Sequence, residues 1–508
     1  MTGPYLARCA DGIVQGHARS DVIRFDGIPF AAPPLGHLRL RPPSRPAPWA
    51  ARLLATQPGP GPLQRPGPAL GTRPVTEVSE DCLRLNIVTP KLEGPRPVMV
   101  WIHGGGFTNG QAADPIHRGE RLVRQGDVVL VTLDYRLGAL GWLHDLDNAE
   151  ASNLGLRDQL MALRWVKDNI SAFGGDPSRV TLFGESAGAM SILALMGAPD
   201  ADTLFQAVIL QSGAAGGLQS PDSARAVRAR FLAALSGRSP CTESAERILD
   251  TQSRVGAAVR TETGRSAWRP VLDGELVQHA ALDAMARPIN RTRPMIIGTN
   301  RDEQRLYVNL RERLDLIDAQ VRVSRVLTGR SAAPAEAARL LVDAYLREHP
   351  TPIVALSAIL TDLYYRVPAI AIAQARARAQ ADTWVYRFDR PSPALRGRLG
   401  ACHALEIPFV FGTLDAPGMS RFAGDDAGAL KLSGAMVMNW ARFARDGRPA
   451  DERWTPWRPE AQTCWIANDA PTVSTEIDRE RMALWRLVLP TAGLSATAGD
   501  EPVPRGEP

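Results

Sequence analysis

Short apolar runs recur along the chain and predict a set of buried strands. They occupy residues 83–88, 98–102, 128–133, 180–183, 207–210, 294–297 and 384–388. Several of these runs are continuous instead of alternating with polar residues, which is typical of strands buried on both faces of a mostly parallel sheet. In the first 60 residues, shorter apolar stretches interrupted by prolines predict small antiparallel edge strands.

Helical periodicity appears between the strand-like runs. One helix is predicted by an apolar stripe whose members are spaced by four, three, three and four positions: Leu156, Leu160, Leu163, Val166 and Ile170.

Longer helical segments are predicted over residues 222–259 and 322–378, and a late helix over residues 436–444. Residues 58–74 are rich in proline and glycine and predict a loop. Residues 491–508 have lost apolar periodicity and predict a disordered C-terminal tail.

Composition and charge exclude several classes of partner. Hydrophobic residues make up 44% of the chain and charged residues 22%, which is ordinary for a soluble protein with a sizeable core. The net charge of +5 is carried by arginines spread along the chain, so we expect no nucleic-acid partner. Residues 1–13 lack the pattern of a signal peptide, and we expect no run to reach the length of a membrane span. No membrane partner is therefore predicted.

One stretch combines a strand end, a sharp turn and the start of a helix. Gly184, Ser186 and Gly188 have the spacing G-x-S-x-G between an apolar run and a helix-compatible run, which is the context of a nucleophile elbow. The two glycines let strand and helix approach closely, and the serine hydroxyl is lifted clear of the sheet. The amide of Ala187 then faces the place where an oxyanion forms. Taken alone, the motif is equally compatible with an ordinary turn.

A second motif lies upstream, directly after the apolar run 97–102. It reads His103-Gly104-Gly105-Gly106-Phe107. A glycine triplet in this position can offer the remaining amides of an oxyanion hole. The two motifs in this order, each after a predicted strand, favour a serine nucleophile over two unrelated turns.

Further motifs give the chain a resemblance to the type-B carboxylesterases, the family of bacterial carboxylesterases and para-nitrobenzyl esterases that also contains the cholinesterases. The matching segments span residues 10–490 in order: F-D-G-I-P-F-A from Phe25, P-P-L-G from Pro33, S-E-D-C-L-R-L-N from Ser79, F-G-G-D-P from Phe173, Q-S-G from Gln211, and G-A-C-H-A-L-E-I-P-F from Gly400.

The resemblance implies a fold and a domain organisation. It implies an α/β-hydrolase fold, with a mostly parallel central sheet, helices on both faces and helical insertions that cap the active site. We therefore expect a single catalytic domain over residues 1–490, followed by the tail at 491–508.

The general base must be a histidine, because a serine hydroxyl needs a base within hydrogen-bond reach. The fold's chain order of serine, acid and histidine leaves His279, His349 and His403. His403 lies in a loop that enters an apolar segment, whereas His279 and His349 lie in polar surroundings. The family pattern G-x-x-H-x-x-E-I-P-F assigns the base to His403.

Two adjacent carboxylates are candidates for the triad acid. Asp302 and Glu303 follow the strand-like run 294–297, so they lie at the carboxyl edge of the sheet, where ligands bind. The family pattern D-E-G selects Glu303. In this chain Gln304 replaces the glycine, which puts the shape of the loop in question.

By this resemblance the chain is a serine hydrolase that cleaves small-molecule carboxylic esters through an acyl-enzyme, with no metal or organic cofactor. The catalytic residues are Ser186, His403 and Glu303, and the oxyanion amides belong to Gly105, Gly106 and Ala187. Supporting residues around Ser186 and His403 are Glu185, Ser212 and Glu406. His103 is expected to shape its loop by hydrogen bonding.

Three functions are alternatives to a carboxylic-ester hydrolase. An amidase or carbamate hydrolase would use the same triad and stays open. A catalytically silent binding protein of the same fold is disfavoured by the complete triad. A cholinesterase is disfavoured because residues 50–81 contain no aromatic side chain to hold a quaternary ammonium. Trp142 and Trp268 are candidates either for the pocket wall or for the core.

The resemblance also predicts charge pairs and the state of the cysteines. Family members pair charges to fix buried loops, which implies the pairs Arg39–Glu80 and Arg136–Asp158. In secreted relatives the cysteine of E-D-C-L bonds an upstream cysteine, but residues 57–70 contain none, so Cys82 is expected to be unpaired. An unpaired Cys82 favours a reducing, cytoplasmic location. No sequence feature indicates an oligomeric state.

Overall fold

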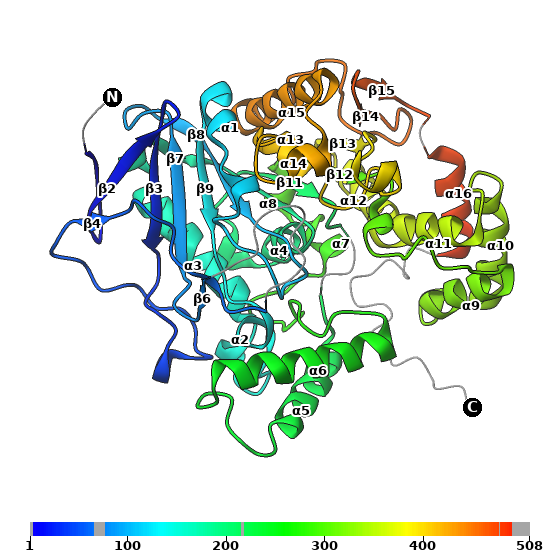
Figure 1. Cartoon of the computed structure of the whole chain (residues 1–508), viewed down its shortest axis with the longest axis horizontal. Coiled ribbons are helices and arrows are strands. Elements are labelled where there is room, and N and C mark those ends of the chain that lie inside the picture. Colours follow the sequence, from blue (N-terminus) through cyan, green and yellow to red (C-terminus); the bar gives the residue numbers. More distant parts are fainter. Residues whose placement is uncertain (1–3, 66–76, 215–217, 477, 490–508) are drawn as a thin grey trace.

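The apolar runs assemble into one large sheet that crosses the molecule (Figure 1). The computed structural model describes residues 4–65, 77–214, 218–476 and 478–489, so the tail predicted at residues 491–508 lies outside the described residues. The strands, in their order across the sheet, are β1 (Tyr5–Cys9), β2 (Gly12–Arg19), β3 (Val22–Pro29), β7 (Arg84–Thr89), β9 (Val129–Leu133), β8 (Arg96–Ile102), β10 (Gly175–Glu185), β11 (Ala207–Gln211), β12 (Met295–Asn300), β13 (Thr383–Phe388), β14 (Cys464–Ala467) and β15 (Thr472–Ser474).

The centre of the sheet is parallel and its edges are antiparallel. From β9 through β8 and β10 to β14, every neighbouring pair of strands is parallel. Strands β1, β2, β3 and β7 join antiparallel at one edge, and β15 pairs antiparallel with β14 at the other. The short β4 (Leu53–Leu54) lies beside β2, while β5 (Gly61–Pro62) and β6 (Val78–Ser79) form a separate pair. The predicted mostly parallel sheet is confirmed, and the N-terminal strands extend it directly.

Helices cover both faces of the sheet, which explains the continuous apolar runs. In β8, Val98, Val100 and Ile102 face one apolar core, and Met99 and Trp101 face another. The first core is covered by α3 (Leu154–Asn169), α4 (Ala187–Met196) and α12 (Val367–Arg378), and the second by α1 (Glu120–Gly126), α13 (Ile407–Phe411) and α15 (Ala427–Asp446). Since both faces are dry, no polar alternation is possible in the central strands.

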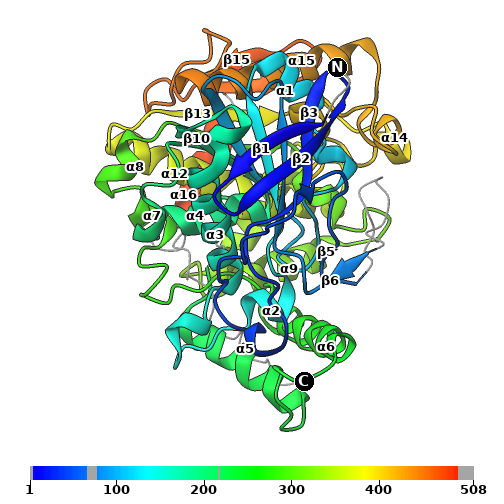
Figure 2. The ribbon, with the colours of Figure 1, turned by 90° about the vertical axis from the view of Figure 1, so that its left-hand side faces the viewer.

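Two groups of helices extend beyond these layers. The cap helices α9 (Leu316–Leu327), α10 (Pro334–Leu346) and α11 (Pro352–Thr361) pack with α16 (Arg479–Val488) around an apolar core of their own (Figure 1). Helices α5 (Pro221–Ala234) and α6 (Ala245–Thr263) lie at the opposite end of the molecule from α15, beside α2 (Gly138–Trp142) (Figure 2). The remaining short helices are α7 (Ala281–Ala284), α8 (Pro288–Thr292) and α14 (Met419–Ala423).

The long helical segments predicted from periodicity are interrupted. The segment 222–259 is divided between α5 and α6, and the segment 322–378 between α9, α10 and the stretch that starts with α11. Gly329 has a φ of +73°, and both Pro334 and Pro352 occupy the start of a helix, where their missing N–H groups cost no hydrogen bond. Periodicity identified the apolar faces but not these ends.

Strands β14 and β15 were not predicted. The run Cys464–Ala467 is short, and Thr472–Ser474 is a polar edge strand, so neither has a strong local signal. Pairing of β14 with β13 and of β15 with β14 decides their conformation.

The expectation that no run reaches the length of a membrane span is wrong. Residues Pro352–Arg378 form one helical stretch of 27 residues, which is long and apolar enough to cross a membrane by length and composition alone. However, 67% of its most apolar window is buried inside the protein. The stretch therefore packs as a core helix, with α11 in the cap and α12 against the sheet.

The two predicted charge pairs are present, with Arg136–Asp158 buried and Arg39–Glu80 partly buried. Arg136 donates from Nε and Nη2 to the two oxygens of Asp158 at 2.8 and 2.7 Å, and the Arg136 amide donates to Asp158 at 3.0 Å. Arg39 is likewise paired with Glu80, with 2.7 Å between Nε and Oε2. Removal of one partner would leave a charge without compensation in a low-dielectric environment.

We expect Asp158→Asn to lower the free energy of unfolding by about 3–5 kcal/mol, because the side chain of Arg136 is only 3% exposed and would lose its counter-ion. Urea denaturation followed by fluorescence measures the change. The control is Asp168→Asn, which removes an exposed partner of Arg45 and should cost less than about 1 kcal/mol. Equal urea midpoints for Asp158→Asn and the parent protein would contradict the expectation.

Candidate active site

Ser186 occupies the corner between strand β10 and helix α4. Its φ of +53° and ψ of −119° lie outside the regions that a non-glycine residue prefers. The corner is held by its backbone, since the Ser186 amide donates to the Gln211 carbonyl at 2.8 Å and the Ser186 carbonyl accepts from Met190 at 2.9 Å. Strain of this kind persists only where the surroundings determine the conformation, and it is concentrated at functional sites.

The two glycines of the motif are required by close packing against strand β8. A Cβ atom on Gly188 would overlap the carbonyl oxygen of Ile102, and one on Gly184 would lie 2.7 Å from the same oxygen. The spacing G-x-S-x-G therefore follows from the approach of three backbone segments at one point. An ordinary turn on the surface would have no such requirement.

The glycine-triplet loop lies against this corner. A Cβ atom on Gly104 would lie 2.6 Å from Glu185 Oε2 and 3.3 Å from the Cβ atom of Ser186. Gly105 has a φ of +109°, and its carbonyl accepts the amide of Asn109 at 3.0 Å, which closes a tight turn. Gly104 therefore lies against Ser186, and Gly105 and Gly106 follow it directly in the same loop.

Ala187, the third residue predicted for the oxyanion hole, begins helix α4. An N–H group in the first turn of a helix has no acceptor within that helix, and it lies at the positive end of the helix dipole. This amide is therefore available to a negatively charged oxygen beside Ser186.

His403 and Glu303 form a buried pair. The Nδ1 atom of His403 lies 2.7 Å from Glu303 Oε2, and neither side chain is more than 4% exposed. The His403 amide also donates to the Glu303 carbonyl at 3.3 Å. The other carboxylate oxygen of Glu303 accepts the Asn300 amide at 2.7 Å. Because the carboxylate accepts at Nδ1, the neutral imidazole carries its proton there and leaves Nε2 free to act as a base.

Asp302, the neighbouring carboxylate, has different partners. Its Oδ2 accepts from the Ala401 amide and from Arg301 Nε at 3.0 Å each, and its Oδ1 lies 3.1 Å from Arg305. Gln304, which replaces the family's glycine, does not have a positive φ and lies in the short helical turn η6 (Glu303–Leu306). The glutamine is therefore compatible with the shape of this loop.

The Nε2 atom of His403 faces Glu185 in this structure. Glu185 Oε1 lies 2.9 Å from Nε2 as a charge contact. In the part of the chain that the structure describes, no hydrogen bond joins His403 to Ser186, the residue that follows Glu185. Bonds of this kind are often long before substrate binds and tighten in the reacting complex.

The environment of His403 favours its protonated form. Burial alone lowers the pKa of His403, but the carboxylate of Glu185, with contributions from Tyr307 and Tyr365, raises it well above the ordinary value of 6.5. The Tyr307 and Tyr365 rings lie 5.5 and 5.1 Å from the imidazole. Since Tyr307 is 58% exposed, solvent screens its effect, and Glu185 is the main cause of the raised pKa.

A polar network lies behind the histidine and the acid. Glu406 accepts from Gln211 at 3.0 Å and from Asn300 at 2.6 Å, and Asn300 also donates to the Cys402 carbonyl at 2.7 Å. Burial raises the pKa of Glu406 to about 7, with Glu185 and Glu303 adding to the effect. Ser212, the third supporting residue, follows Gln211 and has a φ of +51° and a buried hydroxyl.

His103 and the two other candidate bases, His279 and His349, make structural contacts. His103 donates from Nδ1 to the Gly104 carbonyl at 2.8 Å and stacks on Tyr135, with 4.5 Å between ring centres. Burial lowers the pKa of His103 to about 4, so it stays neutral and fixes the glycine loop as expected. The ring of His349 stacks on Tyr345 in the cap, and the carbonyl of His279 packs against Gly197.

The two tryptophans whose roles were open are buried, and so is Cys402, the residue before His403. Trp142 packs against Phe107 and Trp268 against Phe231, both inside the first apolar core. Burial raises the pKa of the Cys402 thiol to about 12, which leaves it unreactive. All five cysteines lie within the described residues, and none forms a disulfide there, so Cys82 is unpaired as expected.

Several residues near the site were missed by sequence reasoning. Tyr365 packs against His403, Thr361 accepts the Gln304 amide at 3.1 Å, and Asn300 and Gln211 belong to the polar network. The positions of Asn300 and Gln211 at the carboxyl ends of predicted strands were a usable signal. Nothing local indicated Thr361 or Tyr365, because Thr361 is 57 positions from Gln304 and Tyr365 is 38 positions from His403.

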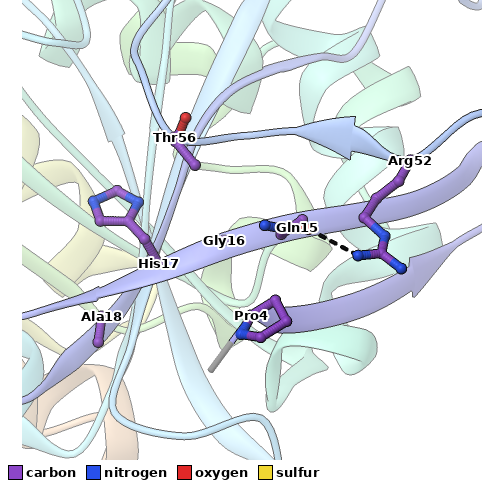
Figure 3. Close-up of a pocket in the computed structure, with 7 residues that line it drawn as sticks. All are labelled: Pro4, Gln15, Gly16, His17, Ala18, Arg52 and Thr56. Carbon is purple, nitrogen blue, oxygen red and sulfur yellow. Dashed lines mark hydrogen bonds between the residues drawn. The ribbon is translucent and has the colours of Figure 1, made fainter. Parts of the chain in front are cut away.

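A surface hollow of about 580 Å³ lies away from these residues. It is lined by residues of β2 and of the segment beside it, including His17, Arg52 and Thr56 (Figure 3). Arg52 donates to Gln15 across it at 3.0 Å. It contains none of the residues around Ser186. Within the described part of the chain, no group of three or more His, Cys, Asp or Glu side chains gathers in a way that could hold a metal ion.

Comparison with known proteins agrees with this arrangement. The chain is 36% identical to the para-nitrobenzyl esterase of Bacillus subtilis (strain 168) over 494 residues, which cover 92% of this chain and 96% of that protein. It is 35% identical to the fumonisin B1 esterase of Sphingopyxis macrogoltabida, with 89% and 84% covered. The solved structure of a Geobacillus stearothermophilus carboxylesterase matches with a TM-score of 0.82 at 33% identity, covering 94% of this chain and 99% of that one.

A family model gives the same result over nearly the whole sequence. Residues 6–485 match the model described as the carboxylesterase family. A thermophilic PNB esterase of known structure, 33% identical, matches with a TM-score of 0.84 over 94% of this chain and 99% of its own. These matches identify a serine hydrolase that cleaves carboxylic esters on an α/β-hydrolase fold, and the chain belongs to the carboxylesterase family.

Proposed function

We propose that Ser186, His403 and Glu303 form the catalytic triad with which this chain hydrolyses carboxylic esters. The amides of Gly105, Gly106 and Ala187 form the oxyanion hole. The observation that carries the proposal is the meeting of two units at one corner: the strained Ser186, and the buried His403–Glu303 pair, whose Nε2 atom lies 2.9 Å from Glu185, the residue before Ser186.

Acylation is the first step of the proposed mechanism. Ser186 Oγ attacks the ester carbonyl carbon while His403 Nε2 takes its proton. Glu303 keeps the Nδ1 proton in place and stabilises the imidazolium that forms. The carbonyl oxygen becomes an oxyanion, and a single amide donor to such an oxygen is typically worth about 3–4 kcal/mol. His403 then passes its proton to the leaving alcohol, which departs from the acyl-enzyme.

Deacylation repeats these roles with water as the nucleophile. His403 takes a proton from water, the hydroxide attacks the acyl carbon, and the proton returns to Ser186 Oγ as the acid leaves. Both half-reactions require neutral His403 at the start. Because Glu185 favours the imidazolium, it sets the pH above which the enzyme becomes active.

Ser186→Ala tests the nucleophile. We expect the variant to lose covalent labelling by a fluorophosphonate probe and to lose ester hydrolysis by at least about 10⁴-fold in kcat, as in other serine hydrolases. Mass spectrometry of the labelled parent protein should identify Ser186 as the modified residue. Circular dichroism checks that the variant is folded. Labelling of folded Ser186→Ala at the parent rate would exclude Ser186 as the nucleophile.

Glu303→Gln and Asp302→Asn test the acid. Glu303→Gln should lower kcat by about 10⁴-fold with little change in KM, because the imidazole loses the group that orients and stabilises it. Asp302→Asn should cost far less in kcat, since its contacts are with Ala401, Arg301 and Arg305. Steady-state kinetics with thermal melts separates catalysis from folding. Reversed losses in folded variants would assign the acid to Asp302.

Glu185→Gln tests the electrostatic role of Glu185. The acidic limb of kcat/KM should move to lower pH, because the neutral amide no longer favours the imidazolium of His403 and the pKa of His403 falls. A pH–rate profile measures the shift. Glu312→Gln, which changes an exposed glutamate of the cap, should leave the profile unchanged. An acidic limb at the parent position, or above it, would refute this role of Glu185.

A further inference from the structure

A turn of π-helix in the cap contacts residues 300–304, here called the acid loop because they include Glu303. The turn η7 (Asp362–Arg366) connects α11 to α12 within one continuous helical stretch. A π-helical turn is rare and has a less favourable hydrogen-bond geometry than an α-helix, and such turns are frequent at functional sites. The extra residue in such a turn changes which side chains face the adjacent loop, so the contacts of this turn can indicate a function.

Three side chains at this turn reach the segment that carries Glu303. Thr361 Oγ1 accepts the Gln304 amide at 3.1 Å. Tyr365 packs its ring against His403, and its hydroxyl lies 3.4 Å from Gln304 Nε2. Arg366 donates from Nη2 to the carbonyls of Asn300 and Arg301, at 3.1 and 3.5 Å. Among these contacts, only those of Arg366 are made by a charged group.

The carbonyls that Arg366 binds are those of Asn300, whose own amide orients the acid, and of the next residue. Asn300 ends strand β12, and its amide donates to Glu303 Oε1 at 2.7 Å. The Asn300 side chain donates to the Cys402 carbonyl, in the loop that carries His403. A rotation of the backbone at Asn300 would therefore move Glu303 and the histidine loop relative to one another. Arg366 opposes this rotation from the cap side.

Arg366 is itself held by two carboxylates. Its Nη1 donates to Asp478 Oδ2 at 2.7 Å, and its Nε faces Asp362 Oδ1 at 3.3 Å. Burial alone would lower the pKa of Arg366, but Asp478, Asp362 and Asp389 raise it, so the guanidinium stays charged. Asp362 also accepts the hydroxyl of Tyr345, which in turn accepts Trp485 Nε1 at 2.7 Å.

This chain of contacts links the acid loop to the C-terminal helix. Asp478 is the residue directly before α16, and Trp485 lies within it. Arg387 in β13 also pairs with Asp478, at 3.1 Å, but its other contacts are with Asp389. Of these two arginines on Asp478, Arg366 is the one that bonds the acid loop.

We propose that Arg366 is a positioning residue for ester hydrolysis: from the π-helical turn it holds the end of β12 so that Glu303 stays against His403, and Asp478 holds Arg366. The inference rests on the proposed function, because it takes Glu303 as the triad acid. Because Asp478 directly precedes α16, full activity then requires α16 to be docked against the cap.

The test compares Arg366→Lys with the matched control Arg387→Lys. Both variants keep the charge beside Asp478, but a lysine ammonium cannot bind Asp478 and the two carbonyls in the fork geometry of arginine. Arg366→Lys should lower kcat by about 10- to 100-fold with KM changed less than about threefold, since misplacement of a catalytic group by about 1 Å can cost about 10²-fold. Arg387→Lys should stay within about twofold of the parent enzyme in both constants.

A double-mutant cycle separates positioning from general stabilisation. In the Glu303→Gln background, Arg366→Lys should lower kcat by less than about twofold, because the acid that it positions has gone. A purely structural role would give the same fold-loss in both backgrounds. Full additivity, or equal losses in Arg366→Lys and Arg387→Lys, would overturn the inference while leaving the triad intact. Parent-like activity of Glu303→Gln would overturn the acid assignment and the inference together.

A second pair of variants applies if Arg366→Lys does not fold. Asp478→Asn removes the carboxylate that holds Arg366 but leaves the guanidinium in place, and Asp389→Asn removes the other partner of Arg387. Asp478→Asn should lower kcat in the parent and not in the Glu303→Gln background. Asp389→Asn should leave kcat within about twofold. Parent-like kcat in folded Asp478→Asn would overturn the role of α16.

Discussion

The close approach of backbone segments at the Ile102 carbonyl is the constraint on which the active site depends. Strand β8 ends there, strand β10 runs beside it, and helix α4 starts against it, so that Gly184 and Gly188 have no room for a side chain. Packing on both faces of the sheet holds these segments together and maintains the unfavourable φ and ψ of Ser186. The position of the nucleophile is therefore a consequence of the sheet core.

The histidine and its acid depend on a different kind of constraint. Their loops leave β12 and the segment after β13, and polar contacts through Asn300, Asp302 and Glu406 hold the loops together. The contacts of Asn300 and Glu406 are buried, so each broken one would leave a polar group without water or a partner. The sheet core aligns the nucleophile by sterics, whereas hydrogen bonds align the base and the acid.

Charge at the site is balanced around one imidazole. Glu185 contacts one side of the ring and Glu303 the other, and Glu406 lies behind them with a raised pKa. Burial of three carboxylates would be costly without a cation or hydrogen-bond donors. His403 supplies a cation when it is protonated, and Asn300 and Gln211 supply donors. The cap adds Arg366 on the outer side of the acid loop, paired with Asp478.

The sequence by itself determined the features that depend on neighbours along the chain. The continuous apolar runs identified the central strands, and the glycine spacing around Ser186 identified the corner, because both patterns express local sterics and burial. The family motifs selected His403 and Glu303 from candidates that the residues alone left open. Tertiary structure decided strands β14 and β15, the helix ends in the cap, the π-helical turn and the contacts of Glu185 and Arg366 with the triad loops. These depend on segments that are distant in the sequence and meet only in the fold, so no local pattern specifies them.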